Sequence, residues 1–285
     1  MRSGLTPSEF SVTDVSGSAE RLIACLRKLS SVAVAWSGGV DSAVVAKAAV
    51  LALGDRAIAV TALSPSLAES ERRTAQSEAR AIGIRHVEIY TSEFEREEYR
   101  RNFGDRCFFC KDTLYALMAA RMEDLQVQCL VNGANVDDLG DHRPGMQAAE
   151  QYNVRNPLIE EGFNKAMVRE LARYWKLSVA DKPASPCLSS RIAYGIEVTE
   201  ERVRRVELAE ACLREVIGVQ EFRVRYEADD LARIEVPLTE LSRFVDQAVR
   251  EAVVKQFLDL GFRNVTLDLQ GFRSGSHNAA LVELT

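Results

Sequence analysis

A short apolar segment followed by a glycine-rich turn constrains this chain of 285 residues more than any other feature. Residues 32–36 read Val-Ala-Val-Ala-Trp, the next six read Ser-Gly-Gly-Val-Asp-Ser, and residues 42–53 have the composition of a helix. A buried strand that turns into a helix through two glycines leaves backbone N–H groups unpaired where an anion can approach closely. The turn therefore predicts a phosphate-binding loop made of Ser37, Gly38, Gly39, Asp41 and Ser42.

The side chains of this loop suit a nucleotide phosphate. The hydroxyls of Ser37 and Ser42 can donate hydrogen bonds to phosphate, and Asp41 is suited to orient the loop or to hold Mg²⁺. The spacing is neither Gly-x-x-x-x-Gly-Lys-Ser/Thr nor Gly-x-Gly-x-x-Gly, which disfavours ordinary kinase and dinucleotide sites. A plain glycine turn without a ligand is the alternative.

Strand-like and helix-like segments alternate along the first two thirds of the chain. We expect further strands at 57–60, 86–90 and 128–131, with helices at 19–29, 70–82, 111–122 and 165–175. Strands separated by helices indicate a parallel sheet that is covered on both faces. The fold class is therefore predicted to be α/β.

The pattern changes near residue 195. A charged helix is expected at 198–216, short strands at 221–226, 232–236 and 264–269, and a second helix at 238–260. We predict a flexible leader over 1–16, a large domain over 17–194, and a small α+β domain over 195–285 that serves substrate binding or oligomerisation.

Composition excludes some classes of partner. The net charge of -6 and the lack of a dense basic run disfavour a nucleic-acid substrate. No apolar stretch is long enough to span a bilayer and no export signal is visible, so we expect a cytoplasmic protein without membrane contact. In a reducing compartment the six cysteines are expected to be thiols, metal ligands or redox groups rather than disulfides.

Three of the cysteines stand out. Cys107 and Cys110 are spaced Cys-x-x-Cys, which places two thiols within reach of one metal, and Cys187 follows a stiff segment with prolines at 183 and 186. Three thiolates would leave one iron of a 4Fe-4S cluster open, whereas a closed zinc site needs a fourth ligand that is not evident. Packing alone is the alternative for the pair, and Cys25, Cys129 and Cys212 are interpreted as core residues.

The loop at 37–42 resembles the signature of the PP-loop ATP pyrophosphatases, which cleave ATP between the α and β phosphates. The resemblance implies a Rossmann-like domain in which Thr61 and Ala62 contact adenosine. It also implies that the stretch 132–138, with Gly133, borders the nucleotide. ATP and Mg²⁺ are the ligands that follow from it.

Further motifs closely resemble the LarE family over nearly the whole chain. They are Asp141-His142-Arg143-Pro144-Gly145, Asn156-Pro157-Leu158, Asn164-Lys165, Asp181-Lys182-Pro183-Ala184, residues 187–192 (Cys-Leu-Ser-Ser-Arg-Ile) and residues 267–273 (Leu-Asp-Leu-Gln-Gly-Phe-Arg). LarE proteins are sulfur transferases in the synthesis of the nickel-pincer nucleotide cofactor. The resemblance implies the substrate pyridinium-3,5-biscarboxylic acid mononucleotide, protein partners of the same pathway, and a homo-oligomer.

Two kinds of LarE differ in their source of sulfur. One kind uses a single cysteine at the place of Cys187 as a sacrificial donor, and the other has three cysteines and holds an iron-sulfur cluster. This chain has all three. The resemblance therefore implies that Cys107, Cys110 and Cys187 ligate a 4Fe-4S cluster whose free iron carries the sulfur.

Two arginines of the small domain suit the phosphate of the substrate. Arg223 and Arg225 alternate on one face of an expected strand, for which a solvated sheet face is the alternative. The family places its substrate-phosphate arginines in this segment. By the same resemblance Ser190 and Arg191 are candidate substrate contacts, and Glu210 is a candidate ligand for a divalent cation unless it is a plain surface charge.

Three other functions compete with sulfur transfer to this nucleotide. A tRNA thiolase joins the same type of loop to cysteines, but the acidic balance and the lack of an RNA-binding appendage disfavour it. An amide-forming synthetase needs ammonia, and the second domain is too short for a glutaminase. A binding module without catalysis leaves Cys187 unexplained.

Overall fold

The computed structural model describes residues 12–140, 144–219 and 221–273. By its contacts the chain forms two compact units. The first unit comprises residues up to 63, 69–91 and 110–185, and the second comprises 64–68, 92–109 and 186 onward. Most of the expected leader and residues 141–143 of the Asp-His-Arg motif lie outside the described residues.

The first unit is built on a four-stranded parallel sheet with the order β3-β2-β1-β4. Its strands are β1 (Val32–Ala35), β2 (Ala57–Leu63), β3 (Arg85–Tyr90) and β4 (Cys129–Val131). Val34 of β1 pairs with Ala59 on one side and Val131 on the other. The all-parallel sheet confirms the α/β class, and its apolar strands are buried because helices cover them.

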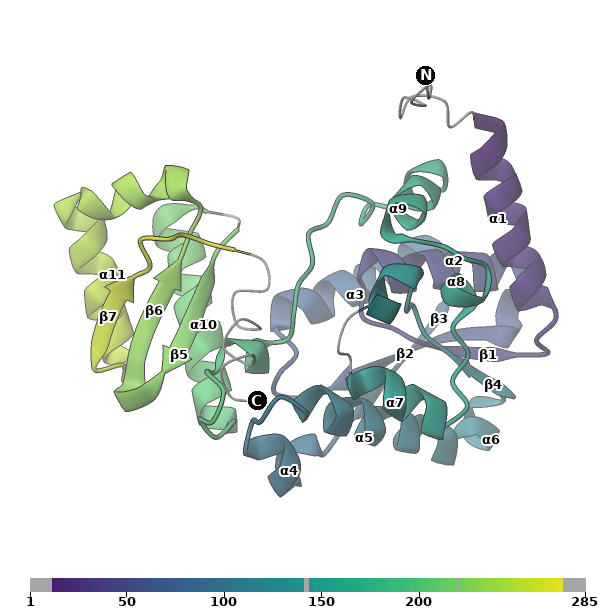
Figure 1. Ribbon diagram of the computed structural model, residues 1–285, viewed down its shortest axis with the longest axis horizontal. Coiled ribbons are helices and arrows are strands. Elements are labelled where there is room, and N and C mark those ends of the chain that lie inside the picture. The colour runs from purple at the N-terminus through teal and green to yellow at the C-terminus, as the bar shows by residue number, and fades with distance from the viewer. Residues whose placement is uncertain (1–11, 141–143, 220, 274–285) are drawn as a thin grey trace, which may run out of the picture. The chain divides into compact units, whose positions relative to one another are not determined.

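Helices lie on both faces of this sheet (Figure 1). Val44 of α2, Leu22 of α1 and Leu171 of α9 are fully buried in one core with the strands. Met118 of α5 is buried as well, and Figure 1 draws α5 and α7 on the opposite side of the sheet from α2. The helices of this unit are α1 (Val12–Arg27), α2 (Val40–Leu53), α3 (Glu69–Ile82), α5 (Arg106–Ala120, from Cys110 onward), α6 (Met122–Leu125), α7 (Pro144–Gln151), α8 (Pro157–Glu160) and α9 (Lys165–Tyr174). The short α4 (Glu97–Arg100) belongs to the second unit.

The strand order reverses beside β1. The chain runs from β1 through α2 to β2 on one side, whereas β4 joins β1 on the other side. In an open α/β sheet such a switch point leaves a crevice outside the carboxyl ends of the two strands, and ligands bind there. The loops that follow β1 and β4 therefore meet at the place that this topology favours for a ligand.

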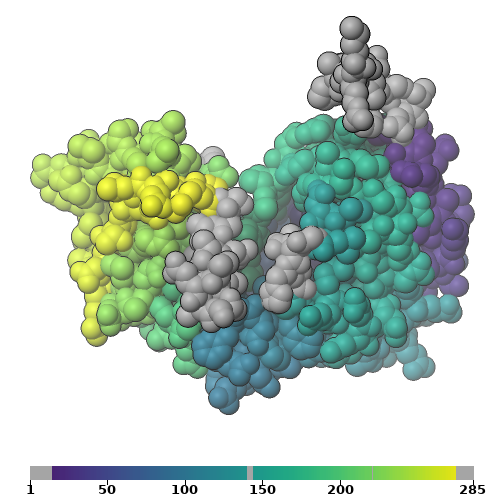
Figure 2. Space-filling model, viewed as in Figure 1, coloured from purple at the N-terminus to yellow at the C-terminus, as the bar shows by residue number. Residues whose placement is uncertain are grey.

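The second unit holds a three-stranded sheet in the order β5-β6-β7, in which β5 and β6 are antiparallel and β6 and β7 are parallel. The strands are β5 (Arg223–Glu227), β6 (Leu231–Glu235) and β7 (Asn264–Leu267), and the helices are α10 (Glu200–Ile217) and α11 (Gln247–Asp259). Val206, Ile234 and Phe257 are fully buried in this unit. The stretch after β7 lies on its surface, drawn yellow in Figure 2, and Leu269 is 79% exposed.

Short 3₁₀ turns complete the architecture. They are η1 (Gly54–Arg56), η2 (Glu93–Glu95), η3 (Val136–Gly140), η4 (Leu188–Arg191), η5 (Ala228–Asp230) and η6 (Leu238–Val245). No helix among the described residues is both long and apolar enough to cross a membrane.

The single helix expected at 238–260 is wrong, because the structure divides it into η6 and α11. Asp246 takes an extended conformation at the break, and its side chain accepts a hydrogen bond from the Val249 amide at 3.0 Å. An aspartate that caps a helix start in this way also ends the preceding turn.

Residues 92–109 pack with the C-terminal part of the chain, although they precede it by about a hundred residues. The Asn102 side chain donates hydrogen bonds to the carbonyl oxygens of Ala193 (2.9 Å) and Ile196 (3.1 Å). Tyr99 Oη lies 2.8 Å from Ser189 Oγ. These contacts place the first turn of α5 in the same unit as Cys187.

Candidate functional site

The glycine-rich loop lies between β1 and α2, at the switch point of the first unit. Gly38 has a positive φ of 68°, and a Cβ at this position would lie 2.9 Å from Ala75 Cα of α3. Gly39 is the N-cap of α2 and no side chain of the described residues caps this helix. The loop therefore presents the backbone start of a fourteen-residue helix, which attracts anions.

The two serines hold the loop in shape. Ser42 Oγ donates to the Gly39 carbonyl at 3.0 Å, and Ser37 Oγ lies 3.2 Å from Ser42 Oγ. The Gly39 amide donates to Ser37 Oγ at 3.3 Å. These bonds explain why both residues flank the glycines, and contact of their hydroxyls with phosphate stays a prediction.

Gly133 lies against the start of α2. A Cβ at Gly133 would be 2.7 Å from the Ser42 amide nitrogen and 2.9 Å from the Asp41 carbonyl carbon. Backbone atoms cannot move aside as a flexible side chain can, so only glycine fits here. The loop after β4 therefore packs directly on the phosphate loop, as the parallel arrangement of β1 and β4 requires.

Asp41 is held by two partners. Its Oδ1 accepts a hydrogen bond from Asn135 Nδ2 at 3.2 Å, and its Oδ2 lies 2.5 Å from Lys165 Nζ at the start of α9. The backbone N–H of Lys165 donates to Asp137 Oδ2 at 2.9 Å. Sequence reasoning assigned no role to Lys165; the available signal was Asn164 before an amphipathic helix, since this residue caps α9 and fixes where it begins.

Thr61 and Ala62 lie near the end of β2. Thr61 is buried, and its hydroxyl lies 3.2 Å from the Trp36 carbonyl oxygen and 2.8 Å from His86 Nε2. Burial lowers the pKa of His86 below its usual value. The Thr61 side chain thus braces the residue that precedes the phosphate loop, and contact of Thr61 or Ala62 with adenosine stays a prediction.

Cys107 and Cys110 lie one turn apart in α5. The helix expected at 111–122 in fact begins at Arg106, so the Cys-x-x-Cys segment is helical and not a loop. Cys107 is exposed and Cys110 is half-buried. Residues three apart on a helix are neighbours on its surface, so the two thiols share one side of α5.

Cys187 is exposed and immediately precedes η4. Cys187 and Cys107 both act electrostatically on the same two groups, Arg106 and Tyr194. Burial acts to lower the pKa of Arg106, but its electrostatic interactions with Cys187, Cys107, Tyr99 and Tyr194 outweigh burial and raise this pKa. Burial, opposed by Arg106 and aided by both cysteines, raises the pKa of Tyr194.

The three cysteines fit an iron-sulfur cluster in kind and number, since such clusters are held by thiolates. Within the described ranges, however, no three Cys, His, Asp or Glu side chains are gathered closely enough to hold a metal ion. Cys107 and Cys187 belong to the second unit, while Cys110 belongs to the part of α5 in the first. The cluster stays a prediction.

The other three cysteines have features of structural thiols. Burial raises the pKa of Cys25 to about 11 and also raises the pKa of Cys129 and Cys212. A raised pKa disfavours the thiolate, which is the nucleophilic and metal-binding form.

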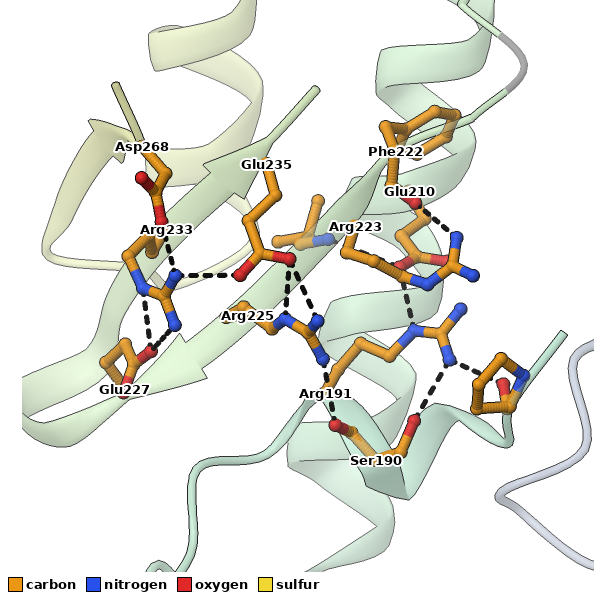
Figure 3. A network of polar contacts seen from close by, with 12 residues as sticks. Ser190, Arg191, Glu210, Phe222, Arg223, Arg225, Glu227, Arg233, Glu235 and Asp268 are labelled. Atoms are coloured by element: carbon orange, nitrogen blue, oxygen red, sulfur yellow. Dashed lines mark hydrogen bonds and ion pairs between the residues drawn. The ribbon is translucent and has the colours of Figure 1, made fainter. Parts of the chain in front are cut away.

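Arg191 clasps the backbone that carries Cys187 (Figure 3). Its Nη1 donates to the carbonyl oxygens of Pro186 (2.5 Å) and Cys187 (3.1 Å) and to Ser190 Oγ (3.1 Å). Its Nε donates at 3.0 Å to Glu210 Oε1, and both side chains are buried. Glu210 is therefore not a plain surface charge, and the guanidinium of Arg191 is engaged within the protein.

Arg223 and Arg225 lie on β5 beside this clasp (Figure 3). Arg225 is buried and donates to Glu235 Oε2 at 2.8 and 3.0 Å, and to the Ser190 carbonyl at 3.1 Å. Burial and then the positive charge of Arg191 lower the pKa of Arg223 to about 10. Arg191, Arg223 and Arg225 thus lie near one another together with Glu210 and Glu235. Because Arg225 is buried, it does not lie on a solvated face of the sheet.

No protein-family model matches the chain. The chain is 35% identical over 268 residues to the pyridinium-3,5-bisthiocarboxylic acid mononucleotide synthase of Lactiplantibacillus plantarum, covering 92% of this chain and 94% of that enzyme. An uncharacterised protein of Synechocystis sp. is 43% identical over 256 residues, or 90% of this chain and 95% of that protein. Another uncharacterised protein, from Methanocaldococcus jannaschii, is 26% identical over 247 residues, which cover 87% of this chain and 92% of that protein.

Fold and site together define an α/β protein whose described residues place a glycine-rich loop and a helix start without a side-chain cap at the switch point of a parallel sheet. The likeness to the Lactiplantibacillus synthase extends over nearly the full length of both chains. The chain belongs to the family of that synthase, the LarE family, and is an enzyme.

Proposed function

We propose that this enzyme is an ATP-dependent sulfur transferase that acts on pyridinium-3,5-biscarboxylic acid mononucleotide. The observation that carries the proposal is kinship with a synthase whose product is the bisthiocarboxylic acid mononucleotide. To make a thiocarboxylate from a carboxylate, an oxygen must leave and a sulfur must replace it. Carboxylate oxygen is a poor leaving group, so the reaction needs prior activation.

The phosphate loop supports activation by ATP. A carboxylate oxygen of the substrate attacks the α phosphorus of ATP, the bond to the pyrophosphate oxygen breaks, and an acyl adenylate and pyrophosphate form. Backbone N–H groups at the start of α2, together with Mg²⁺, would stabilise the charge that develops on the leaving pyrophosphate. Gly38 and Gly39 keep this approach open, and Thr61, Ala62 and Gly133 would border the nucleotide.

Sulfur then replaces the adenylate. A sulfur nucleophile forms a bond to the carbonyl carbon, the bond from carbon to the AMP oxygen breaks, and AMP leaves. The exposure of Cys187 and its position on a clasped backbone support it as the residue that presents sulfur. Cys107, Cys110 and Cys187 would hold a 4Fe-4S cluster, which when bound supplies sulfur at an iron without a cysteine ligand.

The arginines near Cys187 support binding of the substrate phosphate. Arg223, half-buried with a lowered pKa, lies in a positive field that Arg191 and Arg225 contribute. A phosphate dianion entering this field would relieve the repulsion between the guanidinium groups. Ser190 and Arg191 would then act mainly through the backbone of the Cys187 turn, and Glu210 would serve Arg191 or a divalent cation.

The activity is tested with anaerobically reconstituted protein, ATP, Mg²⁺, sulfide and the dicarboxylate nucleotide, and parallel reactions contain tRNA or ammonia in place of that nucleotide. We expect AMP, pyrophosphate and the thiocarboxylate, the last identified by mass spectrometry. Modification of tRNA alone would favour a tRNA thiolase, and an amide formed with ammonia would favour a synthetase; either result without thiocarboxylate would refute the proposal. The proposal also includes that the enzyme forms a homo-oligomer and acts with other proteins of the nickel-pincer pathway.

The cluster is tested separately by anaerobic reconstitution with iron and sulfide. Cys107→Ala, Cys110→Ala and Cys187→Ala should each lower bound iron, whereas Cys212→Ala, which alters a buried thiol of α10, should not. Equal iron in the wild type and all four variants would exclude the cluster and leave Cys187 itself as the sulfur donor.

A further inference from the structure

Lys165 places a positive charge on the phosphate loop. It is the first residue of α9, and its Nζ lies 2.5 Å from Asp41 Oδ2 in the first turn of α2. The two residues are 124 positions apart in the chain. Their side chains are 37% and 26% exposed, so the pair is open to solvent and to a ligand.

The ion pair has little to do with holding the two helices in place. The backbone of Lys165 is fixed by Asp137, whose Oδ2 accepts its N–H at 2.9 Å, and by the Asn164 cap, whose side chain accepts from the Met167 amide at 3.0 Å. Asp41 keeps its hydrogen bond to Asn135. Because partly exposed ion pairs contribute little to stability, a change of partner by the ammonium group would cost little.

The position of Asp41 explains why a nearby cation favours anion binding. A carboxylate in the first turn of α2 repels any anion that approaches the same helix start. Lys165 offsets that charge in the described conformation. A triphosphate carries several negative charges and accepts more hydrogen bonds than one carboxylate, so it competes effectively for an ammonium group with three donors.

We propose that Lys165 is a ligand for the pyrophosphate part of ATP. When nucleotide enters the loop, the ammonium group leaves Asp41 for phosphate oxygens, and the Asp41 carboxylate becomes available to Mg²⁺. This inference rests on the proposed function, because it assumes that ATP is the nucleotide. It adds a residue that contacts the leaving group of the activation step.

Calorimetric titration of the full chain tests the assignment. Lys165→Ala should weaken binding of a non-hydrolysable ATP analogue by about tenfold or more, the loss expected for a hydrogen bond to a charged group. AMP, which lacks the pyrophosphate, should bind the variant and the wild type alike. Arg173→Ala is the matched control, since Arg173 lies on the same helix and pairs with the exposed Asp181.

Asp41→Asn provides a second test with no metal present. The variant keeps an oxygen that can accept from Asn135 but removes the negative charge that occupies Lys165. Metal-free ATP analogue should therefore bind it more tightly than the wild type, whereas a purely structural ion pair predicts weaker binding.

The outcomes separate the two proposals. If the wild type binds no ATP analogue, the proposed function fails and the assignment of Lys165 fails with it. If the wild type binds the analogue and Lys165→Ala binds it equally well, or loses the analogue and AMP to the same extent, only the assignment of Lys165 is overturned.

Discussion

Gly133 has no side chain because the backbone of the phosphate loop occupies the space that one would need. Its Cβ would meet the Ser42 amide nitrogen at 2.7 Å. Gly133→Ala must therefore push the loop after β4 away from α2. We expect a loss of about 1–3 kcal/mol in the free energy of unfolding and weaker binding of the ATP analogue, measured by urea titration and calorimetry.

A neighbouring position provides the control for Gly133. Ala134 is half-buried, and its amide hydrogen bond to Asn132 does not depend on its side chain. Ala134→Ser should change stability by less than about 0.5 kcal/mol. Equal stability of Gly133→Ala and the wild type would contradict the close packing of the two loops.

His86 gives the first unit a predictable response to acid. Burial, and then the positive charge of Arg72, keep the pKa of His86 below its usual 6.5, while Glu88 acts in the opposite sense. Below pH 6.5 the unfolded chain takes up this proton before the folded chain does, so stability is lost as the pH falls through that range. Above pH 6.5 His86 is mostly neutral in both states, so its titration no longer changes the stability.

Urea titrations compare the two proteins over the affected range. His86→Gln keeps a polar group near Thr61 and removes the titration, so it should lose less stability than the wild type between about pH 7 and about pH 5. Because both proteins have the same carboxylates, the difference between their pH profiles removes the contribution of carboxylate titration. Parallel pH profiles would show that His86 is not held neutral.

At the scale of elements, the turn η4 is fixed by a buried ion pair. Glu210 of α10 accepts from Arg191 Nε and from the Val224 amide at 3.2 Å, which ties α10, η4 and β5 together. Glu210→Gln leaves the Arg191 charge buried without its carboxylate. Such a loss typically costs about 3–5 kcal/mol, and we expect the Cys187 turn to loosen as a result.

Two measurements separate this positioning role from simple destabilisation. Urea titration gives the stability, and alkylation of Cys187 by iodoacetamide, followed by mass spectrometry at low denaturant, reports on the turn itself. Glu207→Gln on the same helix is the control, because Glu207 pairs with the exposed Arg204. An unchanged rate of Cys187 alkylation in Glu210→Gln would contradict the role of the Arg191–Glu210 pair in holding the Cys187 backbone.

Local sequence predicted most elements and missed some of their ends. Apolar runs in the first sheet and alternating patterns in the second predicted each strand of the two described sheets, because both patterns follow from how much of a strand is buried. The start of α5 was missed by five residues: the helix begins at Arg106, in a segment that packs with residues from 186 onward, and local sequence does not carry such long-range contacts. The break at Asp246 was also missed, since an aspartate in an otherwise helical pattern is ambiguous.

At the scale of the whole molecule, only the first unit carries tryptophans, so it has an optical reporter of its own. The chain has 2 tryptophans, Trp36 and Trp175, and both lie in the first unit. Their fluorescence therefore follows the unit that holds the phosphate loop. We expect an ATP analogue at about a hundredfold over its dissociation constant to stabilise that fluorescence transition by about 2.7 kcal/mol.

The substrate nucleotide offers the complementary experiment. If the arginines of the second unit bind it, calorimetric titration of the full chain should show that Arg223→Ala weakens its binding. The same variant should leave the effect of the ATP analogue on tryptophan fluorescence unchanged. An equal loss of both effects would contradict the assignment of the two ligands to different units.

The sequence alone determined the α/β class and the glycine-rich loop that joins β1 to α2, because apolar runs, glycines and helix-forming residues are signals that a few consecutive residues carry. Only the tertiary structure decided which residues serve that loop and the Cys187 turn. Lys165 reaches Asp41 because α9 follows a β4 that lies beside β1. Arg191, named from the sequence as a substrate contact, meets Glu210 because folding buries both charges, and buried charges must find partners.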